Sequence, residues 1–189
     1  MSGYAQCLVT SQVDGPAYGN SVTANTPLQP PHATLTLATN YFFIGKKLRV
    51  TASGRISNTV TAVNLTLGLA FGTVATPIIV FNGGANSLVA RATTNVTWEL
   101  VIDFTCRAIG TGTSANGIGT GRLLSEACLG SAANVAVVGS LPLSAPAVGT
   151  GFDSTLNQTV QLVATWGTAS ASNTITCHQY ELTDMTYTP

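Results

Sequence analysis

The stretch that decides the fold is NVTWELVIDFTCRAIG, residues 95–110. As far as Arg107, its apolar side chains fall on one parity, and the other parity is polar except for Val101. The apolar set is Val96, Trp98, Leu100, Ile102, Phe104 and Cys106. A period of two predicts a strand with one face on a core and the other toward solvent. The strand should belong to an antiparallel sheet, because parallel strands are buried on both faces and read as continuous apolar runs.

A glycine-rich stretch, GTGTSANGIGTG (110–121), follows this strand. Residues 112–117 match the first half of a phosphate-binding loop, but Ile118 and Gly119 stand where Lys and Ser/Thr are needed. The dinucleotide pattern G-x-G-x-x-G fails at Ala115. No amphipathic helix follows to offer its N-terminus to a phosphate. We therefore expect a flexible loop between two antiparallel strands that binds no nucleotide.

Similar alternation recurs along the chain. The further expected strands are 33–39, 46–57, 64–72, 76–84, 123–129, 134–143, 158–167 and 173–187. The fourth closes on an Asn82-Gly83 turn signal, and a Pro/Gly-rich link covers 142–151. Eight to ten strands separated by Gly, Asn and Pro turns predict an all-β, antiparallel β-sandwich. A jelly roll is the favoured topology, and an immunoglobulin-like sandwich stays open although its Cys-Trp-Cys framework is not seen.

The N-terminal part of the chain differs from the rest. Residues 1–31 show little periodicity, and residues 32–189 read as a single β-sandwich domain. The first segment holds four of the eight prolines, which are Pro16, Pro27, Pro30 and Pro31. Because proline lacks a backbone donor, we expect an extended arm that docks on a neighbouring molecule, with 5–13 adding to it as an edge strand. The alternative is an N-terminal strand that completes the protein's own sheet.

The composition favours association over charge-driven binding. The 189-residue chain has zero formal net charge and only 7% charged residues, against roughly 25% in ordinary domains. With 45% hydrophobic residues, neutral polar groups such as its 29 threonines must keep it in solution. Such a surface has little electrostatic defence against association, so we expect a homo-oligomer. The missing basic stripe argues against nucleic acid, and the apolar runs are far shorter than the ~20 residues of a membrane helix.

The start of the chain has neither a basic region nor a continuous apolar core, so no signal peptide is expected. Synthesis in a cytosol would keep the thiols reduced. The four scattered cysteines are therefore interpreted mainly as small buried hydrophobes, and they are Cys7, Cys106, Cys128 and Cys177.

Residues able to perform catalysis are scarce. The two histidines are His32, within the proline-rich segment, and His178, whose neighbour Cys177 should face the opposite side of a strand and so not share a metal with it. Glu99 and Asp103 share a strand face but lie about 13 Å apart, beyond the roughly 5–9.5 Å of a glycosidase pair. We therefore expect no catalytic residue, no cofactor site and no metal site.

Four segments resemble small structural proteins encoded in the morphogenesis regions of tailed bacteriophages and prophages. They are KKLRVTASGRIS (46–57), VFNGGA (80–85), TNVTWELVIDFTCRAIGTGTSANGIG (94–119) and GFDSTLNQTVQLVATW (151–166). The resemblance covers most of the chain from about residue 30 and rests on overall pattern. It implies a virion component assembled in the cytoplasm of a host bacterium, and a homotrimer. It supplies no site residues.

Two functions follow as expectations. The first is a capsid decoration (cement) protein that binds the major capsid protein, or another virion protein, and stabilises the head shell. The second is a tail-associated or fibre module that binds a host receptor or glycan through loops such as 110–121. A sugar site favours an aromatic platform, and the main loops hold almost no aromatic residue beyond Phe152, which stands next to a turn aspartate, Asp153. An enzyme is the third class, and the residues it needs are missing.

Overall fold

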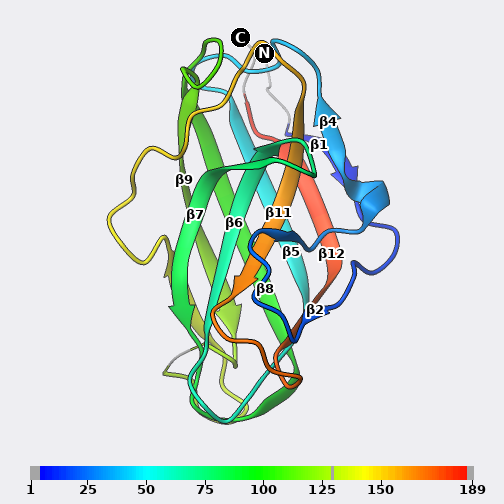
Figure 1. Ribbon diagram of the computed structural model, residues 1–189, viewed down its shortest axis with the longest axis vertical. Helices are drawn as coiled ribbons and strands as arrows, with labels where there is room; N and C mark the ends of the chain where they lie inside the picture. The colour runs from blue at the N-terminus through cyan, green and yellow to red at the C-terminus, as the bar shows by residue number, and fades with distance from the viewer. Residues whose placement is uncertain (1–4, 129, 187–189) are drawn as a thin grey trace.

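The computed structural model describes residues 5–128 and 130–186, in which two antiparallel sheets pack face to face (Figure 1). The larger sheet runs β1 (Gln6–Thr10), β12 (Thr174–Asp184), β5 (Lys47–Asn58), β8 (Thr93–Ala108), β9 (Asn116–Ser125) and β10 (Val137–Leu141), with β2 (Tyr18–Gly19) also on β12. The smaller sheet runs β3 (Thr26–Pro27), β11 (Gln158–Trp166), β6 (Asn64–Gly72) and β7 (Pro77–Ser87), with β4 (Leu35–Leu37) also on β11. A short 3-10 turn spans Pro31–Ala33. The predicted all-β sandwich is confirmed.

The chain passes between the two sheets several times. One hairpin, β6–β7, belongs to the smaller sheet, and another, β8–β9, belongs to the larger sheet. The chain crosses from one sheet to the other between β5 and β6, between β7 and β8, and between β11 and β12. β11 lies beside β6, and β12 lies beside β5, so the last two long strands flank the first two. This order does not confirm the jelly-roll topology.

β8 shows why this sequence folds as a sandwich. It lies between β5 and β9, and its side chains alternate between the core and the outer face as expected. Trp98, Leu100, Ile102 and Phe104 are fully buried. Full burial of each such side chain contributes about 1.5–3 kcal/mol, so this one strand is a large part of the core.

The glycine-rich stretch is only half a loop, which corrects the expectation for 110–121. Residues 116–121 already belong to β9, opposite β8. A Cβ on Gly117 would lie 2.2 Å from Phe104 Cζ, and one on Gly119 would lie 2.4 Å from Phe81 Cδ2. The glycines therefore face inward and leave room for aromatic rings. The predicted turn at Asn82-Gly83 is also wrong, because both residues lie inside strand β7.

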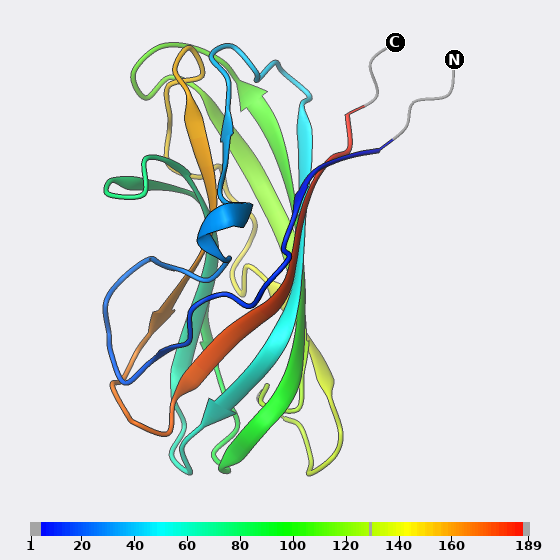
Figure 2. The same ribbon diagram turned by 90° about the vertical axis from the view of Figure 1, so that its right-hand side faces the viewer.

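The N-terminal segment lies on the protein's own sandwich (Figure 2). β1 and β2 run along β12, and β3 crosses to pair with β11 of the other sheet. Tyr18 and Leu28 join the core. This corrects the expectation of a free docking arm: residues 6–19 take the alternative and extend the protein's own sheet, while residues 1–4 lie outside the described part.

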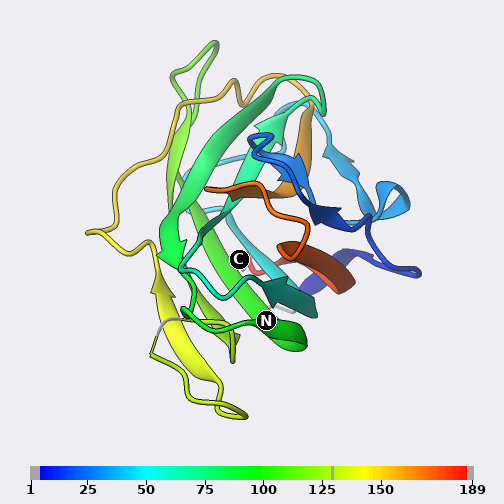
Figure 3. The same cartoon turned by 60° about the horizontal axis from the view of Figure 1, so that its bottom comes forward.

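The link after β10 joins the two sheets on the opposite side of the sandwich (Figure 3). The Gly149 N–H donates to the carbonyl of Gly117 in β9 at 2.9 Å, and the Thr150 N–H donates to Ile79 in β7 at 3.3 Å. A Cβ on Gly149 would lie 1.8 Å from the Val80 carbonyl oxygen, so only glycine permits this approach. Backbone hydrogen bonds from this segment therefore connect the larger sheet to the smaller one.

Candidate functional site

Three loops meet at the end of the sandwich that is uppermost in Figure 1. We call loops 38–46, 108–115 and 150–157 the upper loop cluster. Its centre is Ser154, which is buried and bonds to both other loops. The Ser154 N–H donates to the Gly110 carbonyl at 3.0 Å, and the Asn40 N–H donates to the Ser154 carbonyl at 3.2 Å. The Gly110 N–H in turn donates to Ser154 Oγ at 2.9 Å, so these bonds fix the loops to one another.

Asp153 ties the glycine turn to the same centre. Its Oδ1 accepts bonds from the Thr155 hydroxyl at 2.6 Å and the Thr155 N–H at 2.9 Å, as expected for a turn aspartate. Its Oδ2 accepts the Gly112 N–H at 2.7 Å. The bonds from Thr155 and then Gly112 stabilise the charged carboxylate and lower its pKa. The loop expected to be flexible is thus held by a neighbouring loop.

Beneath the upper loop cluster lies an aromatic floor. Phe71 is fully buried, with its ring centroid 5.0 Å from those of Phe42 and Phe152 and 5.2 Å from that of Phe104. The pairs of Phe71 with Phe104 and Phe152 are edge-to-face, as is the pair Phe42–Phe152 at 5.0 Å, and this geometry is worth about 0.5–1.5 kcal/mol per pair beyond area burial. Phe152, the aromatic residue that the sequence placed in a loop, is core and cannot serve as a platform for a sugar.

An ion pair closes one side of the cluster. Lys46 is buried, with 8% of its surface exposed, and its Nζ bonds to Asp184 Oδ2. The same oxygen accepts a hydrogen bond from the Tyr41 hydroxyl at 2.7 Å. Burial alone would raise the pKa of Asp184, but bonds from Lys46, the Thr186 backbone and Tyr41 outweigh it and hold that pKa below its usual value. Burial and the Asp184 charge raise the pKa of Tyr41. Lys46 Nζ also lies 4.2 Å from the Tyr41 ring centroid, a cation–π contact.

Four large apolar side chains are exposed on the upper loop cluster, among exposed polar residues of the same loops. The large exposed side chains are Phe43 (42% exposed), Ile44 (66%), Ile109 (49%) and Leu156 (58%). We call these four residues the apolar rim. The Gly45 N–H bonds to the Cys106 carbonyl at 2.9 Å, which fixes the loop of Phe43 and Ile44 against the strand that leads to Ile109. Sequence reasoning missed the rim, although the apolar run at 41–44 between two strands was its signal.

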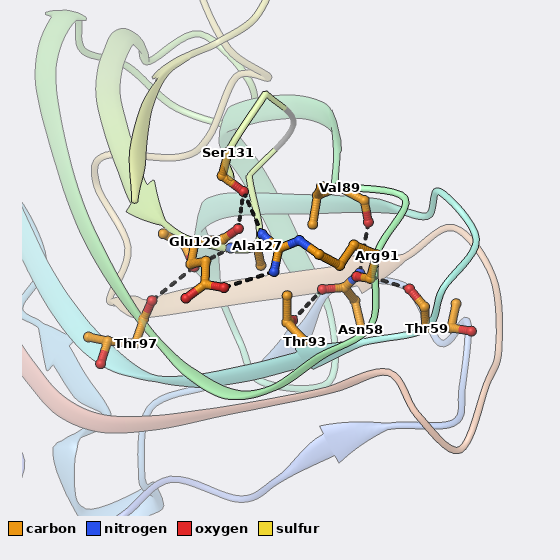
Figure 4. A network of polar contacts seen from close by, with 10 residues as sticks. Asn58, Thr59, Val89, Arg91, Thr93, Thr97, Glu126, Ala127 and Ser131 are labelled. Carbon is orange, nitrogen blue, oxygen red and sulfur yellow. Dashed lines mark hydrogen bonds and ion pairs between the residues drawn. The ribbon is translucent and has the colours of Figure 1, made fainter. Parts of the chain in front are cut away.

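The opposite end of the sandwich is held by polar side chains (Figure 4). The Asn58 Nδ2 donates to the carbonyls of Thr59, Val89 and Arg91 at 2.9–3.0 Å, and its Oδ1 accepts the Thr93 hydroxyl. Asn58 is 1% exposed, so its amide satisfies carbonyls that would otherwise be buried without a partner. We call this set of bonds the lower network.

The lower network continues into an ion pair. Arg91 NH1 donates to Glu126 Oε1 at 2.8 Å, and its NH2 donates to Ser131 Oγ at 3.3 Å (Figure 4). A backbone bond from Asn134, and then Arg91, lower the pKa of Glu126. A cavity of about 290 Å³ lies beside Asn58. It is lined by Ser57, Asn58, Thr59, Val60, Ala92, Thr93, Thr94, Ala171, Ser172 and Thr174, without a charged or aromatic side chain.

His178, His32 and Asp103, singled out from the sequence, each bond to a different partner. His178 Nδ1 lies 2.7 Å from Asp14 Oδ1, and His32 Nε2 accepts the Gln12 N–H at 2.8 Å. Arg49 Nε donates to Asp103 Oδ1 at 2.8 Å, and Arg49 NH2 donates to Asp103 Oδ2 at 2.9 Å.

Three of the four cysteines are buried as expected, and burial raises the pKa of the Cys177 thiol to about 12. Cys7 on β1 is exposed, which corrects the expectation for that residue. In the part of the chain that the structure describes, no three His, Cys, Asp or Glu residues gather to hold a metal ion. No helix among residues 5–128 and 130–186 is long and apolar enough to cross a membrane.

Comparison of the chain with protein-family models, with curated proteins and with solved structures gave no match.

Proposed function

We propose that this chain is a non-enzymatic structural protein of a virion, and that it decorates the head shell and stabilises it. The observation that carries the proposal is the apolar rim: four large apolar side chains stand exposed on loops that are bonded to one another. The contact made by the rim would be with the major capsid protein or another virion protein. The resemblance to phage morphogenesis proteins supplies the setting.

Physical chemistry supports binding through this end. Removing apolar surface from water contributes about 25 cal/mol per Å², so a few aliphatic side chains on one end give useful affinity. Binding normally loses part of this to the ordering of loops. Here Ser154 and Asp153 hold the loops in place before any partner arrives, so little further ordering is needed. The low charge of the chain removes the repulsion that would oppose close packing of many copies on a shell.

The alternative, a tail-associated or fibre module that binds a host receptor or glycan, has less support. A sugar platform needs a free aromatic face, and the aromatic residues to consider at this end are Phe43 of the rim and Tyr41, two positions before it. Lys46 lies over both rings, at 4.2 Å from the Tyr41 centroid and 5.3 Å from that of Phe43. The cavity at the lower end has no aromatic lining.

The test is the location and stoichiometry of the chain in purified virions of the phage or prophage that encodes it. We expect mass spectrometry to detect it in fixed ratio to the major capsid protein, and purified protein to cosediment with empty heads lacking it. Recovery only with isolated tails would support the alternative. Virions that do not contain the chain would contradict both.

A further inference from the structure

Every β-sheet edge exposes unpaired backbone groups, and proteins usually protect such edges with bulges, prolines, charges or very short strands. Three of the four edges of this sandwich are protected. On the smaller sheet, β3 and β4 have only two and three residues. On its other side, β7 begins with Pro77, has register shifts, and is crossed by the segment that bonds to Ile79.

The edge formed by β1 and β2 is protected as well. A register shift between Cys7 and Val9 disturbs β1. Residues 12–14 then interrupt the pairing with β12, and Asp14 there lies against His178.

β10, on the opposite edge of the larger sheet, has none of these features. Its five residues pair with β9 in unbroken register, from Val137 opposite Ser125 to Leu141 opposite Gly121. In the described part of the chain, no other strand pairs with its free side. Residues 127–152, which contain β10, include no Asp, Glu, Lys, Arg or His. Val138 and Ser140 point outward, and Val138 is 60% exposed. Leu141, at the end of β10, is buried against Gly83 of β7, and Figure 3 shows the strand in yellow at the edge of the larger sheet.

We propose that β10 pairs antiparallel with β10 of a second copy about a two-fold axis, so that two large sheets continue into one. A free, regular strand edge can bond to another strand along its whole length, and a two-fold axis lets the same edge serve as its own partner. Centred on Gly139, the pairing puts Val138 opposite Ser140 of the second copy, a large side chain beside a small one with no charge at the contact. This assignment deepens the self-association of the proposed function but does not depend on the virion role. It gives a dimer in place of the trimer that the resemblance implies.

The test compares one substitution on each edge of the larger sheet. Val138→Lys places a charge on the proposed interface, and Thr10→Lys places the same charge on β1, where the side chain is also exposed. We expect wild-type protein and Thr10→Lys to sediment at twice the 19.3 kDa chain mass at micromolar concentration. Val138→Lys should weaken the dimer at least about tenfold, since charged side chains on an edge oppose strand pairing.

Two further measurements keep the result interpretable. Thermal unfolding of Val138→Lys, extrapolated to low concentration, should match that of wild type, because the side chain already faces solvent. Amide hydrogen exchange of residues 137–141 should be slow in the dimer and faster in the variant. A wild-type monomer, a trimer, dissociation by both substitutions or by neither would each overturn the β10 pairing. Each of these results would leave the location of the chain in virions as a separate question.

Discussion

The two ends of the sandwich are held together in different ways. At the upper end, backbone groups bond to Ser154 and Asp153 above the rings around Phe71, and apolar side chains face outward. At the lower end, the Asn58 amide and the pair formed by Arg91 and Glu126 satisfy the loops. The upper end therefore exposes four large apolar side chains among polar ones, whereas the lower end exposes the smaller apolar side chains of Val60 and Val135 beside hydroxyl and amide groups.

This difference indicates which end meets a partner. Single exposed hydrophobic residues are normal on any protein, and Val60 at the lower end is one of them. Several on loops that are bonded to one another are a different feature, because the loops need little ordering when a partner binds. The predictions below test whether the two ends differ as described.

The largest effect is expected at the aromatic floor. Phe71→Ala removes a fully buried ring that contacts three other rings, and should lower the free energy of unfolding by about 3–5 kcal/mol. Phe43→Ala, on the exposed rim, is the matched control and should change it by less than about 1 kcal/mol. Urea unfolding measures both. Equal effects would mean that the floor does not support the upper end.

A smaller effect is expected where β9 passes the floor. In Gly117→Ala, the added methyl group would meet the Phe104 ring and the Thr105 carbonyl, and overpacking of this kind costs about 1–3 kcal/mol. Thr120→Ala, exposed on the same strand, is the control and should stay within about 0.5 kcal/mol of wild type. If the two variants unfolded at the same urea concentration, the inward position of Gly117 against the Phe104 ring would be contradicted.

The lower network should contribute a comparable or smaller amount. Asn58→Ala leaves buried carbonyls without their donor, a loss of about 1–3 kcal/mol. Thr61→Ala, in the same connection but exposed, should stay within about 0.5 kcal/mol of wild type. An Asn58→Ala protein as stable as wild type would show that water replaces the network.

The smallest expected effect is a difference between the two ends in how their contribution to the free energy of unfolding depends on pH. The pKa of Asp184 is depressed in the folded protein, so its contribution is present above the ordinary value of 3.8 and is lost as the pH falls through the folded value. The difference in free energy of unfolding between wild type and Asp184→Asn should therefore become smaller as the pH falls from 5 to 2.5. The difference for Asn58→Ala involves no titrating side chain and should not become smaller. Parallel behaviour of the two differences would contradict the ionic account of the upper end.

The sequence predicted the sandwich because alternation over long strands is a strong signal, as in β8. It failed where small residues occupy inward positions, since Gly117 and Gly119 look like loop residues although they pack against rings. It also failed for the N-terminal segment, because the burial of Tyr18 and Leu28 depends on strands more than 130 residues away in the chain. Prolines there mark an extended chain but not the surface that it covers.

The candidate site was harder to predict than the fold. The apolar rim is contributed by three loops that are distant in sequence, and bonds to Ser154, Asp153 and Cys106 bring them together. Phe43 and Ile44 carry no motif, and the same apolar run would be expected of a buried strand. Asp153 was recognised as a turn residue, but its bond to Gly112 required the fold.

The most direct test of the central claim is binding of rim variants to empty heads from the same phage. Ile44→Ser combined with Leu156→Ser removes two exposed side chains from the upper loop cluster, and Val60→Ser removes an equally exposed one from the lower end. We predict that the double variant loses about 10- to 100-fold in affinity, from about 1.5–3 kcal/mol of lost burial, while Val60→Ser binds like wild type. Unchanged binding of the double variant, or a loss with Val60→Ser alone, would contradict the assignment of the upper end as the docking surface.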